Sequence, residues 1–155
     1  MSDESRRKAL NTAANVLQYK QRSAAALYDR LIEKELDPED AAYAVARLQE
    51  LGYLNEDEYA ASVCRELAAR GYGRARARAA LRDKKVPAEV AERALEDFRP
   101  DEDRLQSYIA AKLGDEREPD RGAVKRLTDG LFRRGFSWEE IRAALRAHLE
   151  SDIDE

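Results

Sequence analysis

The stretch "LIEKELDPEDAAYAV" (residues 31–45) returns twice, as "LRDKKVPAEVAERAL" (residues 81–95) and "LFRRGFSWEEIRAAL" (residues 131–145). The three copies lie 50 residues apart. Each copy has a basic residue at its fourth position, a glutamate at its ninth and an alanine at its fourteenth. A fixed period of this length indicates a tandem repeat of one supersecondary unit.

The sequence around each copy predicts three short helices per unit. Ala, Leu, Arg and Glu dominate the chain, while only seven Gly and four Pro interrupt it, a mixture that favours helix over sheet. Pairs of large apolar residues four apart, such as Leu27 and Leu31 or Ile141 and Leu145, give the helices one apolar stripe each. The predicted helices span residues 6–19, 23–35, 38–51, 56–70, 74–85, 88–98, 102–113, 121–134 and 138–149.

We therefore predict an all-α protein built from three tandem repeats of a three-helix unit of about 50 residues. The repeats cover residues 1–54, 55–99 and 100–150, and an acidic tail covers residues 151–155. A unit of this size buries little surface alone. Neighbouring units are therefore expected to stack into an elongated, solenoid-like array.

Composition restricts where the protein is expected to act. The 155-residue chain lacks the apolar run of a secretory signal, and no apolar stretch approaches the roughly 18 residues that span a bilayer. Its single cysteine, Cys64, cannot form an internal disulfide. We expect a cytoplasmic monomer without a membrane anchor.

Positive charge is concentrated in the middle repeat. The chain has a net charge of −4, yet residues 65–85 carry eight basic and two acidic side chains. With 100° per residue in a helix, Arg74, Arg78, Arg82 and Lys85 share one arc beside the packing face. Such a patch favours phosphates or acidic side chains, although a solvated helix face is the alternative interpretation.

The candidate binding residues come from this window and from a weaker basic stretch at residues 121–134. Tyr72, between two glycines, is included because its ring is able to stack on a base. The candidates for contact with DNA or with a protein partner are Arg70, Tyr72, Arg74, Arg78, Arg82, Lys84, Lys85, Lys125, Arg126, Arg133 and Arg134.

The sequence gives little support for an enzyme. His148 is the only histidine, and neither it nor Cys64 has a partner at metal-ligand spacing. No Walker-type phosphate loop is present. We predict no catalytic residue, no metal ion and no cofactor. Trp138 is interpreted as a residue that packs on the neighbouring helix, with a contact to a partner as the alternative.

Several segments resemble the RecX family, the small bacterial regulators of the RecA recombinase. They are "LQYKQRSAAALYDRLIEKEL", "LQELGYLNEDEYAASVCRELAARGYGRARARAALRDKKV" and "LTDGLFRRGFSWEEIRAALRAHL". The middle segment is the most specific, because "GYLNEDEYA" followed by "RGYG" is similar to the family's "GYLDDxxFA…KGxG" pattern. Two positions depart from the family: Ala26 replaces an acidic residue, and Lys85 replaces a glycine.

The resemblance implies a curved, elongated array of three-helix repeats without catalytic residues or cofactor. It also implies binding to the RecA–DNA filament and inhibition of RecA ATP hydrolysis, strand exchange and co-protease activity. The basic middle repeat is then expected to contact single- or double-stranded DNA. Two alternatives are a free-standing helical DNA-binding protein and a helical-repeat adaptor for another protein.

Overall fold

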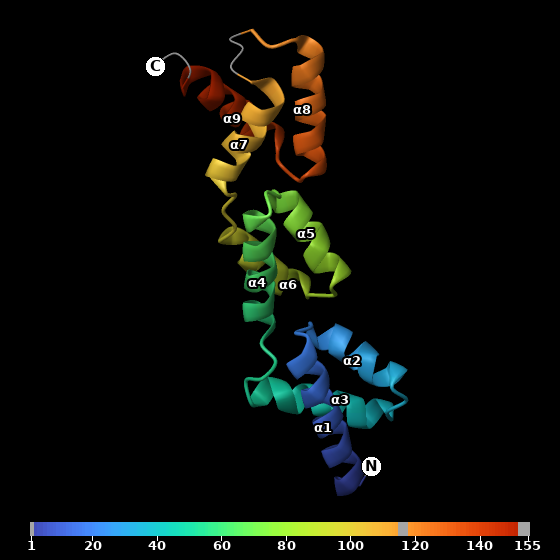
Figure 1. Cartoon of the computed structure of the whole chain (residues 1–155). Helices are drawn as coiled ribbons and strands as arrows, with labels where there is room; N and C mark the ends of the chain where they lie inside the picture. The colour runs from blue at the N-terminus through green and yellow to red at the C-terminus, as the bar shows by residue number, and fades with distance from the viewer. Residues whose placement is uncertain (1, 115–117, 152–155) are drawn as a thin grey trace. The chain divides into compact units, whose positions relative to one another are not determined.

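The structure describes residues 2–114 and 118–151, and the secondary-structure elements in this part of the chain are all α-helices (Figure 1). The computed structural model confirms the predicted all-α class. Residues 152–155 of the predicted acidic tail lie outside the described residues. The helices are α1 (Asp3–Tyr19), α2 (Ala24–Glu33), α3 (Pro38–Glu50), α4 (Glu56–Ala69), α5 (Arg74–Asp83), α6 (Ala88–Glu96), α7 (Glu102–Leu113), α8 (Arg121–Arg133) and α9 (Trp138–Ser151).

The helix ends follow the predicted bounds to within three residues, and caps explain them. Helix α1 begins three residues earlier than predicted, because the side chains of Ser2 and Ser5 each accept the other's backbone amide at 3.1 Å. A capping box also begins α9. There Glu140 N–H donates to Ser137 Oγ at 3.1 Å, and Ser137 N–H donates to Glu140 Oε1 at 2.9 Å.

Helices α1, α2 and α3 enclose one apolar core. Small residues are frequent where α1 packs against α3, which lets the two backbones approach closely. The buried residues of this core are Ala9, Ala13, Leu17, Leu27, Leu31, Ala41, Ala44, Val45, Leu48 and Leu54. Its alanine content agrees with the composition of the sequence.

Helices α7, α8 and α9 enclose a second core with larger side chains. Its buried residues are Ile109, Leu113, Leu127, Leu131, Phe136, Ile141 and Ala144. His148 on α9 is buried beside it, with Nε2 3.2 Å from the carbonyl oxygen of Gly114. The histidine therefore contributes to packing at the end of α7.

The same turn ends the second helix of each repeat. The amide five residues after the repeat's leucine donates to that leucine's carbonyl, at 3.2, 3.0 and 3.1 Å for Leu31, Leu81 and Leu131. The residue before this amide has a left-handed backbone in all three copies, with φ of 67° at Glu35, 61° at Lys85 and 99° at Gly135. The 50-residue period is thus visible in backbone geometry, and it includes Lys85 although that residue has a β-carbon.

In two places, the residue before the second helix of one repeat donates a hydrogen bond to this turn of the next repeat. We call these two contacts the joints. In the first joint, Ser23 is fully buried, and its hydroxyl donates to the carbonyl of Lys84 at 2.5 Å. Lys85 also forms an ion pair with Asp29. A single hydroxyl and one ion pair therefore connect the start of α2 to the end of α5.

The second joint uses backbone groups and two glycines. The amide of Gly73 donates to the carbonyl of Arg134 at 2.7 Å, and the amide of Ala75 donates to the carbonyl of Gly135 at 3.1 Å. A Cβ on Gly73 would lie 2.5 Å from the Gly135 oxygen, and a Cβ on Gly135 would lie 2.4 Å from the Arg76 nitrogen. Only glycine allows this approach of α5 to the end of α8.

The chain divides into two compact units. One contains Met1–Ser62 and Ala80–Ala94, and the other contains Val63–Ala79 and Leu95–Glu155. The first joint lies within the first unit and the second joint within the second unit. The predicted repeat boundaries at residues 54 and 99 stay a prediction. Among the described residues, no helix is long and apolar enough to cross a bilayer.

Candidate anion-binding surface

Three arginines surround the ring of Tyr72, just before α5. The guanidinium carbons of Arg70, Arg76 and Arg134 lie 5.7, 5.1 and 5.4 Å from the ring centroid. Each distance lies within the range of a cation–π interaction. The tyrosine ring therefore holds three like charges close together on the second compact unit.

Arg134 also contacts a second aromatic ring. Its guanidinium carbon lies 4.8 Å from the centroid of Tyr108 on α7, while Lys112 approaches the same ring at 5.7 Å. Arg134 is thus in contact with Tyr72 and Tyr108 together. These contacts orient the guanidinium without neutralising its charge.

A cavity of about 100 Å³ lies beside Arg134. Its lining residues are Gly71, Arg104, Leu105, Tyr108, Leu131 and Arg134. A Cβ on Gly71 would lie 3.2 Å from Arg104 Nε and 3.5 Å from Arg134 Nη1, and Gly71 has a φ of +87°. The glycine therefore leaves a space between two guanidinium groups. A water needs only about 10–15 Å³, so this space accommodates a group of several atoms.

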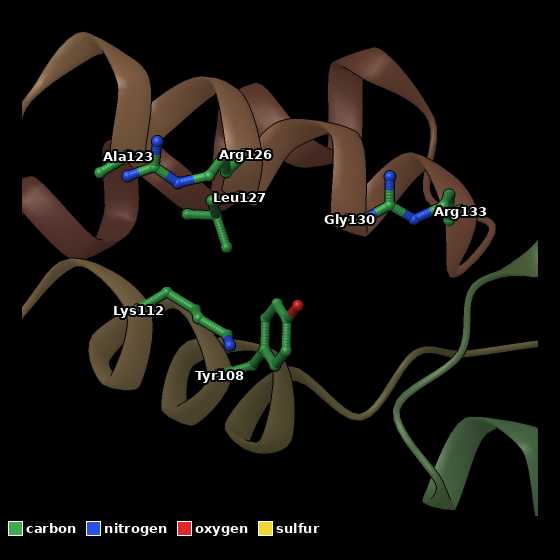
Figure 2. Close-up of a pocket in the computed structure, with 7 residues that line it drawn as sticks. All are labelled: Tyr108, Lys112, Ala123, Arg126, Leu127, Gly130 and Arg133. Atoms are coloured by element: carbon green, nitrogen blue, oxygen red, sulfur yellow. The ribbon is translucent and has the colours of Figure 1, made fainter.

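A larger cavity of about 280 Å³ lies between α7 and α8 and shares Tyr108 with the first (Figure 2). Figure 2 shows Tyr108 and Lys112 on α7 facing Leu127 on α8. Gly130 lets Tyr108 approach α8, because a Cβ there would lie 3.2 Å from the tyrosine oxygen. Arg126 and Arg133 complete the basic lining.

Neither cavity has an acidic lining residue. Within residues 2–114 and 118–150, no carboxylate lies in ion-pair distance of the cations that line the cavities or flank Tyr72, except Glu66, 3.8 Å from Arg70. Lys125 is different, because its ammonium pairs with Asp129 at 2.9 Å. A chain with a net charge of −4 thus has a local surface of uncompensated positive charge. We call the two cavities and the Tyr72 cluster the anion-binding surface.

Five of the predicted binding residues belong to this surface. Arg70 and Arg134 each contact the ring of Tyr72, and Arg126 and Arg133 line the larger cavity. No observation of this structure tests what they bind.

The other predicted residues are placed differently. Arg74 donates from Nε to the carbonyl of Leu95 at 3.2 Å and from Nη2 to that of Phe98 at 3.3 Å, so it caps the end of α6. Lys85 and Lys125 have carboxylate partners. Arg78 and Lys84 are half-buried, and Arg82 is exposed. The predicted arc of cations on α5 therefore includes side chains that already serve the fold.

Sequence reasoning missed four residues of the surface: Arg76, Arg104, Tyr108 and Lys112. A helical projection separates Arg76 from the predicted arc, but Tyr72 precedes the helix and reaches it. The other three stand at positions i, i+4 and i+8 of α7, which places them on one face. That spacing is the feature of the sequence from which these three residues could have been grouped.

Trp138 and Cys64 lie outside the anion-binding surface. Trp138 stacks on Phe132, with ring centroids 5.9 Å apart and an interplanar angle of 8°. The two rings remain 48% and 50% exposed. Cys64 is buried, and burial raises the pKa of its thiol. Among the described residues, no group of His, Cys, Asp and Glu is arranged to hold a metal ion.

Comparisons with known proteins agree on one family. Residues 9–48 match the sequence profile of "RecX, first three-helix domain", and residues 55–95 match "RecX, second three-helix domain". The Regulatory protein RecX of Xanthomonas axonopodis pv. citri is 32% identical over 139 residues, 89% of this chain and 86% of that protein. The corresponding protein of Stenotrophomonas maltophilia is 27% identical over 135 residues, 86% of this chain and 83% of that protein.

Solved structures give the same fold. A crystal structure of RecX from Lactobacillus salivarius superposes with a TM-score of 0.84 and 21% identity, covering 95% of this chain and 98% of that one. A crystal structure of another regulatory protein RecX gives a TM-score of 0.79 over 92% of this chain and 73% of that one, again at 21% identity. The predicted helical repeat architecture is therefore confirmed.

Proposed function

Because the chain belongs to the RecX family, we propose that it binds the RecA–DNA filament and inhibits RecA ATP hydrolysis, strand exchange and co-protease activity. The family name and the regulatory role of its relatives support this proposal. It acts in the cytoplasm, where that filament forms, and as a monomer. It uses no cofactor and performs no catalysis of its own.

The anion-binding surface contacts DNA phosphates within that filament. The supporting observation is the pair of acid-free cavities that share Tyr108 and are lined by five cations: Arg104, Lys112, Arg126, Arg133 and Arg134. Guanidinium groups match phosphate oxygens with paired hydrogen bonds. Two neighbouring cavities suit successive phosphates of one strand better than a single anion.

The remaining charge of the chain supports selectivity for the filament. Outside residues 65–85 the chain carries a net charge of −10. That charge disfavours general coating of duplex DNA, whose phosphates repel it. Arg78, Arg82 and Lys84 of the basic middle repeat stay predicted contacts, with DNA or with acidic side chains of RecA.

RecA ATP hydrolysis on single-stranded DNA tests the proposal directly. Substoichiometric amounts of the wild-type chain are expected to suppress hydrolysis. Arg104→Gln combined with Arg134→Gln is expected to weaken suppression at least about tenfold, since it removes two charged contacts. Arg142→Gln combined with Arg146→Gln on α9 is the matched control, because it removes the same charge outside the two cavities.

A second pair of variants changes shape without changing charge. Gly71→Ala puts a methyl group between Arg104 and Arg134, whereas Gly52→Ala, with a φ of +83°, has no atom within 4 Å of the added Cβ. Both carry similar backbone strain, so only Gly71→Ala is expected to lower affinity for DNA. Wild-type chain that leaves RecA unaffected would favour the adaptor or free-standing DNA-binding alternatives and overturn the proposal.

A further inference from the structure

The two joints show what the turn after each second helix accepts. The carbonyls of Lys84 and Arg134 occupy the same repeat position, and each accepts a hydrogen bond from the start of another helix. The donor is the hydroxyl of Ser23 in one joint and the amide of Gly73 in the other. The turn is therefore a receptor for the first turn of a helix.

The equivalent turn of the first repeat is empty. Lys34 corresponds to Lys84 and Arg134, yet no described residue donates to its carbonyl. A hollow of about 490 Å³ lies at this turn. Its walls come from α1, from the turn and from the start of α3. The lining residues are Ser5, Lys8, Ala9, Thr12, Lys34, Glu35, Leu36, Asp37 and Asp40. We call this hollow the first-repeat socket.

Asp40 gives the first-repeat socket an unpaired acceptor. The residue is only 7% exposed, and its buried Oδ1 has no hydrogen-bond partner among the described residues. At the same repeat position, Val90 has no polar side chain, and Glu140 accepts the amide of Ser137. A buried carboxylate oxygen without a donor costs stability. Its presence at the wall of an empty receptor points to a ligand that supplies donors.

The first turn of an α-helix supplies such donors. Its leading amides have no partner within their own helix, and the helix dipole makes that end positive. The first-repeat socket presents the opposite features, the unpaired carbonyl of Lys34 and the carboxylate of Asp40. Its lining is acidic by one charge, with three carboxylates (Glu35, Asp37 and Asp40) against the ammonium groups of Lys8 and Lys34. Shape, hydrogen bonding and charge therefore agree on the same kind of occupant.

The second helix of the third repeat, in a second copy of the chain, does not provide this occupant. The residue equivalent to Ser23 and Gly73 in the third repeat is Ala123, which lies inside α8 rather than before it. Its amide already donates to Asp120 Oδ2 at 3.3 Å. The start of α8 is therefore self-capped.

We propose that the first-repeat socket docks the first turn of an α-helix of the protein that this chain regulates. The occupant has a small or hydroxyl-bearing residue before the helix, as at Gly73 and Ser23, and its leading amides meet the carbonyl of Lys34 and the carboxylate of Asp40. The proposal rests on the proposed function for the identity of the partner, RecA.

Two substitutions test the docking with the RecA filament on single-stranded DNA as the probe. Asp40→Val removes the acceptor and copies the residue of the second repeat. Lys8→Trp places a large side chain at the wall of the socket. Both are expected to raise the concentration for half-maximal suppression of RecA ATP hydrolysis by about fivefold or more.

Neighbouring residues provide matched controls. Glu39→Val removes an exposed carboxylate from the same helical turn, and Arg7→Trp makes the same change of size and charge outside the socket. Neither is expected to change the half-maximal concentration more than about twofold. Asp40→Val is also expected to raise Tm by about 2–4 °C, because the free chain buries the carboxylate without a partner. That signature separates a docking residue from a structural one.

The outcomes are distinguishable. If the wild type suppresses RecA and the socket variants suppress it equally, the docking proposal is overturned and the proposed function stands. If the wild type has no effect on RecA, both are overturned. A lower Tm for Asp40→Val would reveal an existing partner and contradict the proposal. Sedimentation showing self-association of the wild type that Asp40→Val abolishes would assign the first-repeat socket to a second copy instead.

Discussion

The second joint predicts an unusual sensitivity to the smallest possible substitution, Gly73→Ala. The added Cβ would lie 2.5 Å from the Gly135 oxygen, 2.6 Å from its carbonyl carbon and 2.8 Å from the next backbone nitrogen. All three atoms are backbone, so no side-chain rotation relieves the overlap. The end of α8 and the start of α5 must separate.

The expected loss follows from two contributions. Overpacking costs about 1–3 kcal/mol, and weakening the two backbone hydrogen bonds of the joint costs about 0.5–1.5 kcal/mol each. Gly73→Ala is therefore expected to lower the free energy of unfolding by about 2–6 kcal/mol. The change is measured by urea denaturation followed by circular dichroism at 222 nm.

Gly114→Ala is the control for this experiment. Gly114 lies in the same compact unit and has a φ of +65°, but nothing lies within 4 Å of an added Cβ. Its cost is backbone strain alone, about 1–3 kcal/mol, because its ψ of −154° puts it in a region that only glycine adopts readily. If Gly73→Ala destabilises no more than Gly114→Ala, the close approach of the two backbones is wrong, and the assignment of this joint fails with it.

Four further substitutions have defined outcomes. Ser23→Ala is expected to destabilise by about 1–3 kcal/mol in urea denaturation, because it removes a helix cap and leaves the buried carbonyl of Lys84 without its donor. Glu35→Gly is expected to stabilise by about 0.5–1 kcal/mol in the same assay, since φ is 67° there and a β-carbon is unfavourable. Arg74→Gln is expected to destabilise by about 1–3 kcal/mol, because two carbonyls at the end of α6 lose their donor, while DNA affinity measured by fluorescence anisotropy falls less than twofold. Desolvation, with a smaller effect of the neighbouring Asp57, raises the pKa of Glu56 above its ordinary value of 4.5. The folded chain therefore binds this proton more tightly than the unfolded chain, and stability is lost as the pH rises from 4.5 through the folded-state pKa. Glu56→Gln is expected to remove the part of this pH-dependent loss of stability that comes from Glu56. An identical pH dependence of the urea midpoint in the variant and the wild type would contradict this assignment.

The fold was largely predictable because its determinants are periodic. The leucines at positions 31, 81 and 131 recur with one spacing and occupy the same buried place in the same turn. Even the left-handed residue recurs, although Glu35 and Lys85 carry no local sequence signal for that conformation. Comparison with Gly135 at the same repeat position was needed to anticipate it. Repetition thus carries conformational information that a single residue type does not.

The candidate site was less predictable, because it joins residues from different repeats. Tyr72 precedes α5, Tyr108 lies on α7 and Arg134 ends α8, and no helical projection of one element brings them together. The excess of basic residues in the sequence pointed to α5 and the turn after it. There, however, Arg74 donates to a backbone carbonyl and Lys85 pairs with Asp29. The density of positive charge in a sequence predicts an anion-binding site without placing it. The contacts of each cation decide where.

The joints connect these two conclusions. Gly73 enters the end of α8 only because it has no side chain, and this approach brings Tyr72 beside Arg134. The backbone contact that stabilises the second compact unit therefore also assembles the cation cluster. The first joint is held by the hydroxyl of Ser23. Lys84 is the equivalent of Arg134, but among the described aromatic contacts none involves Lys84. The first joint has Arg22 where the second joint has Tyr72, so it lacks the ring around which the cation cluster forms.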